Sequence, residues 1–72
     1  MQIEFTNNIE IKIEEYINKT GTNKTWIANQ LGMSRQRLYG LIQAKNPNII
    51  TLIKLSLILH CTVNDLYKYK IK

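Results

Sequence analysis

The sequence predicts one small all-α domain of five short helices, together with a two-stranded antiparallel ribbon that joins the two ends of the chain. Three observations predict this fold class. The chain has 72 residues, which is room for a single domain over residues 1–72. Apolar residues recur at helical spacing through its middle. Gly21, Gly32 and Pro47 fall between the apolar segments, where such residues end helices or form turns.

The first two elements precede Gly21. Residues 1–5 alternate between apolar and polar side chains, which is the period of a strand. Asn7 and Asn8 are N-cap candidates for a helix over residues 9–19, whose apolar positions follow helical spacing. Gly21 ends this helix because glycine adopts the left-handed conformation readily. The start of this segment also alternates, so a strand stays open as an alternative there.

Three further helices are predicted before residue 60. The first covers residues 24–31 and the second runs from residue 35 to about residue 44. Residues 45–48 form a turn, because Pro47 forces the residue before it out of the helical region. The last of the three covers residues 51–59, with leucines spaced along one side.

The C-terminal residues complete the ribbon. Thr62 caps a short fifth helix that buries Leu66. The tail over residues 67–72 alternates strictly, with a lysine at every second position. We expect residues near 2–5 to pair with residues near 67–71, since acidic and basic side chains on opposite strands attract each other. The alternative is a frayed basic tail.

Charge is distributed unevenly along the chain. The net charge is +5, from ten basic and five acidic residues. Four glutamates against one lysine give −3 over residues 1–15, and nine basic residues against one aspartate give +8 over residues 16–72. A domain with one basic side attracts polyanions, chiefly nucleic acid or an acidic membrane. A generally solvated basic surface is the alternative.

Several functional classes are disfavoured. A single cysteine, Cys61, allows no internal disulfide and favours a reducing, cytoplasmic setting. No apolar run approaches the roughly 20 residues of a membrane span, and the acidic N-terminus does not resemble a signal peptide. His60, Cys61 and Asp65 are too few for a metal cluster or a nucleophile triad. We therefore expect no enzyme, no metal and no cofactor, and we interpret Cys61 as a core residue.

Residues 24–43 carry the pattern of a helix-turn-helix, which is a DNA-binding motif. Each restrictive position has a physical reason. Ala28 faces the partner helix, where a larger side chain would separate the two helices. Gly32 supplies the positive φ that the turn needs. Met33 fills the gap behind the turn, and Leu38 anchors the second helix in the core.

The stretch after the motif strengthens this interpretation. It carries a second set of residues in a fixed order: Pro47, Leu52, Leu55, Leu59, Cys61-Thr62 and Leu66. With these residues, the chain resembles the phage-repressor-like, Cro/cI-type (XRE) helix-turn-helix family over about residues 8–66. The resemblance implies a lambda-repressor-like fold and a transcription regulator of phages, plasmids or other mobile elements, acting as a dimer on a palindromic operator. His60 departs from the family, which usually has a helix-ending glycine there.

The resemblance also indicates which residues contact DNA. In such folds the start of the second motif helix enters the major groove. We expect four residues to contact bases: Arg35, Gln36, Tyr39 and Gly40. Arginine can donate twice to guanine, and glutamine can pair with adenine. We expect six residues to contact phosphates: Lys24, Thr25, Ser34, Arg37, Lys45 and Asn46. Alternatively, the two arginines are only solvated surface charges. Trp26 either packs against the fold or donates to a phosphate.

The helix over residues 51–59 and the residue before it show a second apolar stripe. Ile50, Ile53 and Leu57 lie outside the leucines expected in the core, so we predict a homodimer interface there. A wider core packed against the ribbon is the alternative. The sequence thus predicts a sequence-specific regulator that binds double-stranded DNA, with neither a membrane nor a small-molecule ligand as partner. A protein-interaction module on the same fold, antitoxin-like or anti-repressor, is the alternative function.

Overall fold

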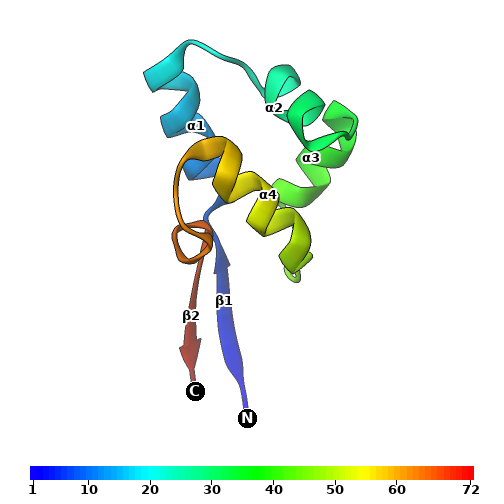
Figure 1. Ribbon diagram of the computed structural model, residues 1–72. Coiled ribbons are helices and arrows are strands. Elements are labelled where there is room, and N and C mark those ends of the chain that lie inside the picture. The colour runs from blue at the N-terminus through cyan, green and yellow to red at the C-terminus, as the bar shows by residue number, and fades with distance from the viewer.

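The computed structural model describes residues 1–72 and shows a mostly helical domain from which a thin ribbon extends (Figure 1). The element order is β1 (Ile3–Asn7), α1 (Ile9–Thr20), α2 (Lys24–Leu31), α3 (Arg35–Ile42), α4 (Ile49–Leu59), a 3₁₀ helix η1 (Val63–Leu66) and β2 (Tyr67–Ile71). The α-helices pack together at one end, and both chain termini lie at the far end of the ribbon. The molecule is consequently elongated, with principal extents of 40 × 22 × 16 Å.

The predicted count of five helices is wrong, because the fold has four α-helices and a single 3₁₀ turn. Thr62 does precede this turn, and its backbone N–H donates to Asp65 Oδ2 at 3.0 Å. Leu66 is fully buried, as expected. The chain must be extended from Tyr67 onward to pair with β1, so only four residues remain between Thr62 and the strand. That length closes one tight turn and no α-helix.

The helix boundaries differ from the expected ones at both sides of Pro47. Helix α3 ends at Ile42, two residues before Ala44. Helix α4 begins at Ile49, two residues before the expected start, because Asn48 is its N-cap. The Asn48 side-chain oxygen accepts from the backbone N–H groups of Ile50 and Thr51, at 2.8 and 3.4 Å.

Helix α1 is confirmed, which rules out the strand alternative for its first residues. Asn8 occupies its N-cap position without using its side chain. The capping oxygen belongs instead to Asn7, whose Oδ1 accepts from the Ile9 N–H at 2.9 Å. Gly21 ends the helix with φ of 76°, and its N–H donates to the Ile17 carbonyl at 2.9 Å.

A single hydrophobic core joins all four α-helices and η1. It contains eleven buried side chains: Ile9, Ile13, Ile27, Ala28, Leu31, Leu38, Ile42, Leu52, Leu55, Leu59 and Leu66. Met33 packs against this core from the turn between α2 and α3, as predicted. The core thereby fixes α2 and α3 relative to the other helices.

The terminal ribbon is confirmed, so the frayed tail is excluded. Strands β1 and β2 pair antiparallel, with Ile3 opposite Ile71 and Phe5 opposite Tyr69. Glu4 lies opposite Lys70. Its carboxylate forms an ion pair with Lys72, with Nζ and Oε2 3.1 Å apart. The ribbon therefore has one apolar face and one face that carries charge.

Candidate nucleic-acid interface

The turn between α2 and α3 is closed by specific backbone and side-chain bonds. Asn23 Oδ1 accepts from the Trp26 N–H at 2.8 Å, which caps α2. Gly32 adopts φ of 69° and ends that helix, and the Met33 N–H donates to the Ala28 carbonyl at 3.0 Å. Ser34 Oγ then accepts from the Arg37 N–H at 3.2 Å, which caps α3. These bonds hold the two helices of the motif in one fixed arrangement.

Helix α3 presents one exposed face and one buried face. The exposed face carries Arg35, Gln36, Tyr39 and Gly40, spaced i, i+1, i+4 and i+5. Leu38 and Ile42 on the opposite side are buried in the core. A Cβ atom added at Gly40 would meet no atom within 4 Å, so packing within the domain does not require glycine there. The structure thus places all four predicted base-contacting residues on one accessible surface, which we call the α3 stripe.

Two cationic side chains, Arg35 and Lys24, lie against the ring of Tyr39 in the α3 stripe. Arg35 Nη2 donates to the Tyr39 hydroxyl oxygen at 3.2 Å, and the guanidinium carbon lies 5.8 Å from the ring centroid. From α2, Lys24 Nζ lies 5.4 Å from the same ring centroid. A cation near an aromatic ring is attracted by the ring quadrupole. Both side chains are therefore restrained at the surface before any ligand binds.

Glu14 of α1 lies beside the motif, and the sequence analysis did not identify it as part of the candidate site. Its Oε1 lies 3.2 Å from Lys24 Nζ, so it places an acidic group beside a predicted phosphate contact. The Glu14 side chain is half exposed, which leaves the pair accessible to solvent. No local pattern indicates this contact, because Glu14 belongs to a different helix and precedes the motif by ten residues. The ion pair lowers the positive charge that the start of α2 offers to an anion.

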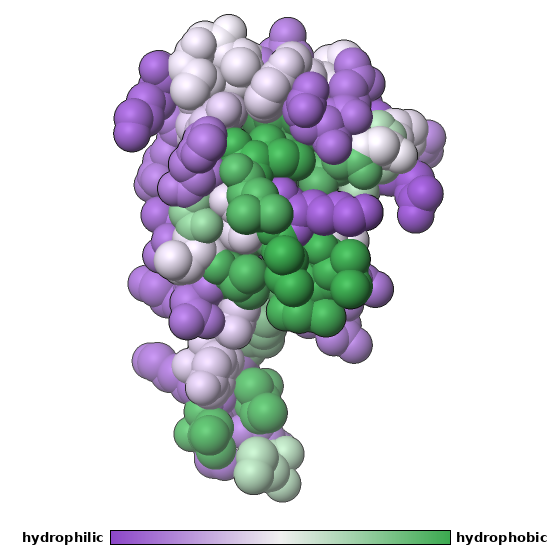
Figure 2. Space-filling view, viewed as in Figure 1, coloured by the Kyte–Doolittle hydropathy of each residue, from purple (hydrophilic) through white to green (hydrophobic).

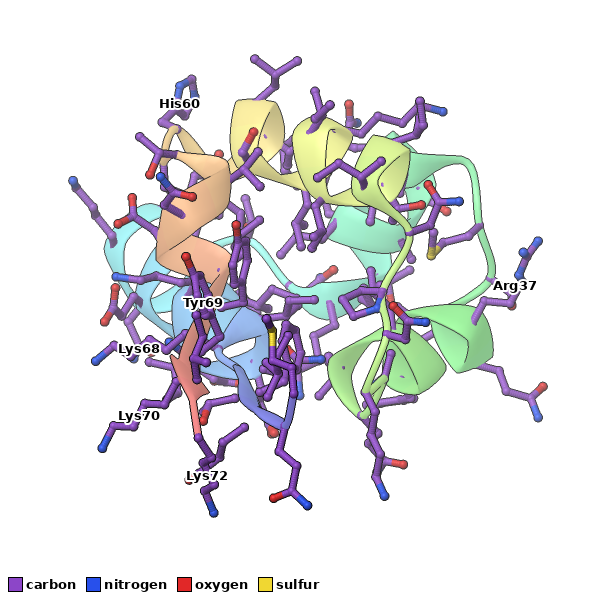
Figure 3. All side chains as sticks on the ribbon, turned by 90° about the horizontal axis from the view of Figure 1, so that it is seen from below. Arg37, His60, Lys68, Tyr69, Lys70 and Lys72 are labelled. Atoms are coloured by element: carbon purple, nitrogen blue, oxygen red, sulfur yellow. The ribbon has the colours of Figure 1, made fainter.

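The remaining predicted phosphate contacts lie around α3. Thr25, Ser34 and Arg37 are exposed at the starts of α2 and α3, and Lys45 and Asn46 are exposed in the connection to α4. Arg37 projects away from the domain on the side opposite to the lysines of β2 (Figure 3). The exposed positions thus flank both ends of the α3 stripe.

Comparison with known proteins identifies the family of this fold. A model of the Cro/C1-type HTH DNA-binding domain matches residues 12–72. The chain belongs to this family. The match covers the helix-turn-helix, α4 and β2, whereas β1 lies outside it. A search of curated proteins finds no match.

Residues near the end of α4 in this Cro/C1-type domain have structural roles. His60 adopts φ of 55° and ends α4, although L-amino acids other than glycine rarely take this conformation. Cys61 is half-buried and packs against the core, and burial raises the pKa of its thiol. Nowhere do three His, Cys, Asp or Glu side chains gather as a metal-ligand group.

Trp26 lies between its two expected roles. Its ring stacks on Tyr16 of α1, with centroids 6.3 Å apart, and it remains 38% exposed. The packing interpretation is therefore supported by a specific contact. Its exposed part lies in the first turn of α2, next to Thr25.

Helix α4 of the Cro/C1-type domain carries an uncovered apolar surface. Ile50, Ile53 and Leu57 are exposed by 58%, 44% and 71%, and Ile49 by 56%. We call these four residues the α4 apolar patch, which forms the hydrophobic band over α4 in Figure 2. The alternative of a wider core against the ribbon is wrong, because these side chains face solvent. None of the helices has the length and apolar character needed to span a bilayer.

Proposed function

We propose that this Cro/C1-type domain is a sequence-specific regulator of transcription that inserts α3 into the major groove of double-stranded DNA. The observation that carries the proposal is the α3 stripe. Polar side chains that can bond to base edges share one accessible surface, while the opposite side of the same helix is fixed in the core. A helix held in this way presents its side chains in a defined register, which reading of a sequence requires.

Two residues of the α3 stripe supply base discrimination in this proposal. The Arg35 guanidinium offers paired donors to O6 and N7 of a guanine, and the Gln36 amide can bond to N6 and N7 of an adenine. The bond from Arg35 to Tyr39 limits the conformations of the guanidinium before binding. Gly40 allows the helix to approach the bases closely, since no side chain intervenes.

The other polar residues contribute affinity that does not depend on sequence. Lys24 and Thr25 lie at the start of α2, where backbone N–H groups and the helix dipole favour a phosphate. Ser34, Arg37, Lys45 and Asn46 contact the backbone of the duplex around the groove. Each neutralised phosphate releases counterions, so binding weakens steeply as salt is raised.

The proposed assembly is a homodimer on a palindromic operator. One helix-turn-helix reads few base pairs, so two copies are needed for half-sites about 34 Å apart. The α4 apolar patch supports this proposal, because exposed contiguous apolar surface marks an interaction site. Occupation of the operator would block or recruit polymerase. The regulator would act in the cytoplasm, in a repressor-like role for a phage, plasmid or other mobile element. No catalytic step is part of this function.

The test is selection of bound sequences from a random pool, followed by comparison of variants on the selected site and on random DNA. Arg35→Ala should weaken binding to the selected site by about 1–3 kcal/mol and relax the base preference. Lys45→Ala should weaken both DNAs equally and reduce the slope of log affinity against log salt by about 1. Lys19→Ala, a lysine at the end of α1, is the matched control for loss of charge.

Three outcomes would contradict the proposal. An equal loss on both DNAs for Arg35→Ala would remove its base-reading role. Binding without salt dependence, or no selected sequence at all, would instead favour a protein-interaction module on the same fold. The exposed apolar faces of α4 and the ribbon would then be the surfaces to examine.

A further inference from the structure

The side chain of Asn7 joins three elements that are far apart in the sequence. Its Oδ1 accepts from the Ile9 N–H at 2.9 Å, at the start of α1. Its Nδ2 donates to the carbonyl oxygens of Leu41 and Ala44, at 3.1 and 2.8 Å. Asn7 is also the last residue of β1 and lies opposite Tyr67 in the ribbon. One amide thus connects the ribbon, the start of α1 and the C-terminal end of α3.

Helix α3 differs from the other α-helices in how it ends. Helices α1, α2 and α4 each end at a residue with left-handed φ: Gly21, Gly32 and His60. The residue that follows α3 is Gln43, with φ of −98° and ψ of 0°. A left-handed residue normally directs backbone N–H groups to the last carbonyls of a helix. At α3 the backbone N–H groups of Gln43 and Ala44 donate to the carbonyls of Tyr39 and Leu41. The Asn7 side chain adds donors from outside the helix, to the Leu41 carbonyl and to that of Ala44 just beyond the helix.

The chemistry of this contact requires an amide. An amide supplies two N–H donors and one carbonyl acceptor, and Asn7 uses all three groups. A carboxylate has the same shape but no donor, and its charge would face two carbonyls at the negative end of the α3 dipole. Asn8, the next residue, has no side-chain bond at the α1 N-cap. Asn8 therefore provides an adjacent asparagine that lacks this side-chain contact.

We propose that Asn7 is a positioning residue for DNA recognition, which holds the C-terminal end of α3 against the junction of β1 and α1. This inference rests on the proposed function, because α3 is the helix that reads the bases in it. Asn7 contacts no DNA itself, and it lies outside the residues matched to the family. Through this contact the ribbon and the recognition helix form one mechanical unit, and a displacement of β1 shifts the register of the α3 stripe.

The experiment compares Asn7→Asp and Asn7→Ala with the matched controls Asn8→Asp and Asn8→Ala, at a temperature where circular dichroism shows each variant folded. The first readout is hydrogen exchange of the backbone amides from Gly40 to Ala44, which requires no DNA. Loss of both donors should speed this exchange about tenfold in the Asn7 variants relative to α2, whereas the Asn8 variants should match the wild type.

The second readout is affinity for the selected site and for random DNA. Relative to the Asn8 variants with the same substitution, the Asn7 variants should lose about tenfold on the selected site and less on random DNA, since only two of the proposed phosphate contacts, Lys45 and Asn46, adjoin this contact. Equal losses on both DNAs would show that Asn7 only stabilises the fold and would overturn the positioning role. Unchanged exchange at the end of α3 would overturn it whatever DNA binding shows.

A third readout separates charge from shape. The carboxyl introduced by Asn7→Asp should become a donor as it is protonated, so the stability of this variant relative to Asn7→Ala should rise as pH falls below about 5. No such pH dependence would overturn the assigned contact. Failure of the wild type itself to distinguish the selected site would refute the proposed function, and the exchange and pH readouts would still decide whether Asn7 holds α3.

Discussion

The helix-turn-helix and the terminal ribbon both follow simple sequence patterns, but they differ in how much of their apolar surface is buried. In the motif, Ile27 and Leu38 are fully buried and both helices are capped by side chains. In the ribbon, Ile3, Tyr69 and Ile71 remain exposed by 60%, 61% and 65%. Two-stranded ribbons are marginally stable on their own. The comparison shows that the domain concentrates its buried side chains and helix caps in the motif and leaves most of the ribbon exposed.

The largest expected effect breaks the motif and leaves the ribbon intact. Leu38→Ala should lower the free energy of unfolding by about 2–5 kcal/mol, because it creates a cavity in a core that cannot collapse fully. Ile71→Ala should change it by about 0.5 kcal/mol or less, since that side chain is mostly exposed. Urea titration followed by circular dichroism measures both. Similar losses for the two variants would mean that the ribbon belongs to the cooperative core.

The two glycines of the motif sharpen the distinction between stability and binding. Gly32→Ala should destabilise the domain by about 1–2 kcal/mol, because φ of 69° disfavours a Cβ atom. Gly40→Ala should stabilise it by about 0.5–1 kcal/mol, since alanine is a better helix former and the space is open. Gly40→Ala should nevertheless weaken binding to the selected DNA site. A stabilised variant with unchanged DNA affinity would show that α3 does not approach the bases at this point.

Much of the fold could be predicted from the sequence, because local patterns determine it. Gly32 acts through the backbone within four residues of itself, so its role at the end of α2 was predicted. The caps formed by Asn23 and Ser34 are equally local, because each accepts from a backbone N–H three residues later. The alternating ends predicted the ribbon as well. The contacts of Asn7 with Leu41 and Ala44 span 34 and 37 residues, and no local pattern encodes such a distance.

In the candidate site too, positions within one helix could be expected from the sequence, whereas contacts between helices could not. The family resemblance indicated the four residues of the α3 stripe, and helical spacing explains why they share one face, since the buried and exposed positions of a short helix follow from its period. The ion pair of Glu14 with Lys24 was missed, because it depends on how α1 packs beside α2. The fifth helix was overestimated, because capping residues predict where a helix starts and not how long it continues.

A smaller effect tests whether the acidic group of Glu14 weakens the attraction between the motif and DNA. Glu14→Gln should raise affinity for both selected and random DNA a few-fold, about 0.5–1 kcal/mol, because it removes an acid and frees Lys24. Filter binding at two salt concentrations measures this change. Glu10→Gln is the control, since it removes an equal charge from the first turn of α1. Equal gains for both variants would indicate a general charge effect and no specific role for the Glu14 pair.

The smallest effect concerns the ribbon side of the molecule. The bond from the Thr62 backbone N–H lowers the pKa of the Asp65 carboxyl below its ordinary value. The unfolded chain therefore binds this proton more readily, so the stabilisation is present above pH about 4 and is lost as pH falls through the lower folded pKa. Asp65→Asn should flatten the stability profile between pH 5 and pH 2, roughly the range in which an aspartate titrates. An unchanged profile would contradict the capping role of Asp65.

The pairing of β1 with β2 also determines where the molecule can be extended. The backbone N–H of Lys72 donates to the carbonyl of Gln2 at 2.8 Å, so the two ends of the chain are adjacent, and they lie far from α3 (Figure 1). A fluorescent tag or tethered protein attached at either end would point away from a bound duplex. A short linker could also close the chain into a circle, with new ends opened in the exposed loop at Gly21.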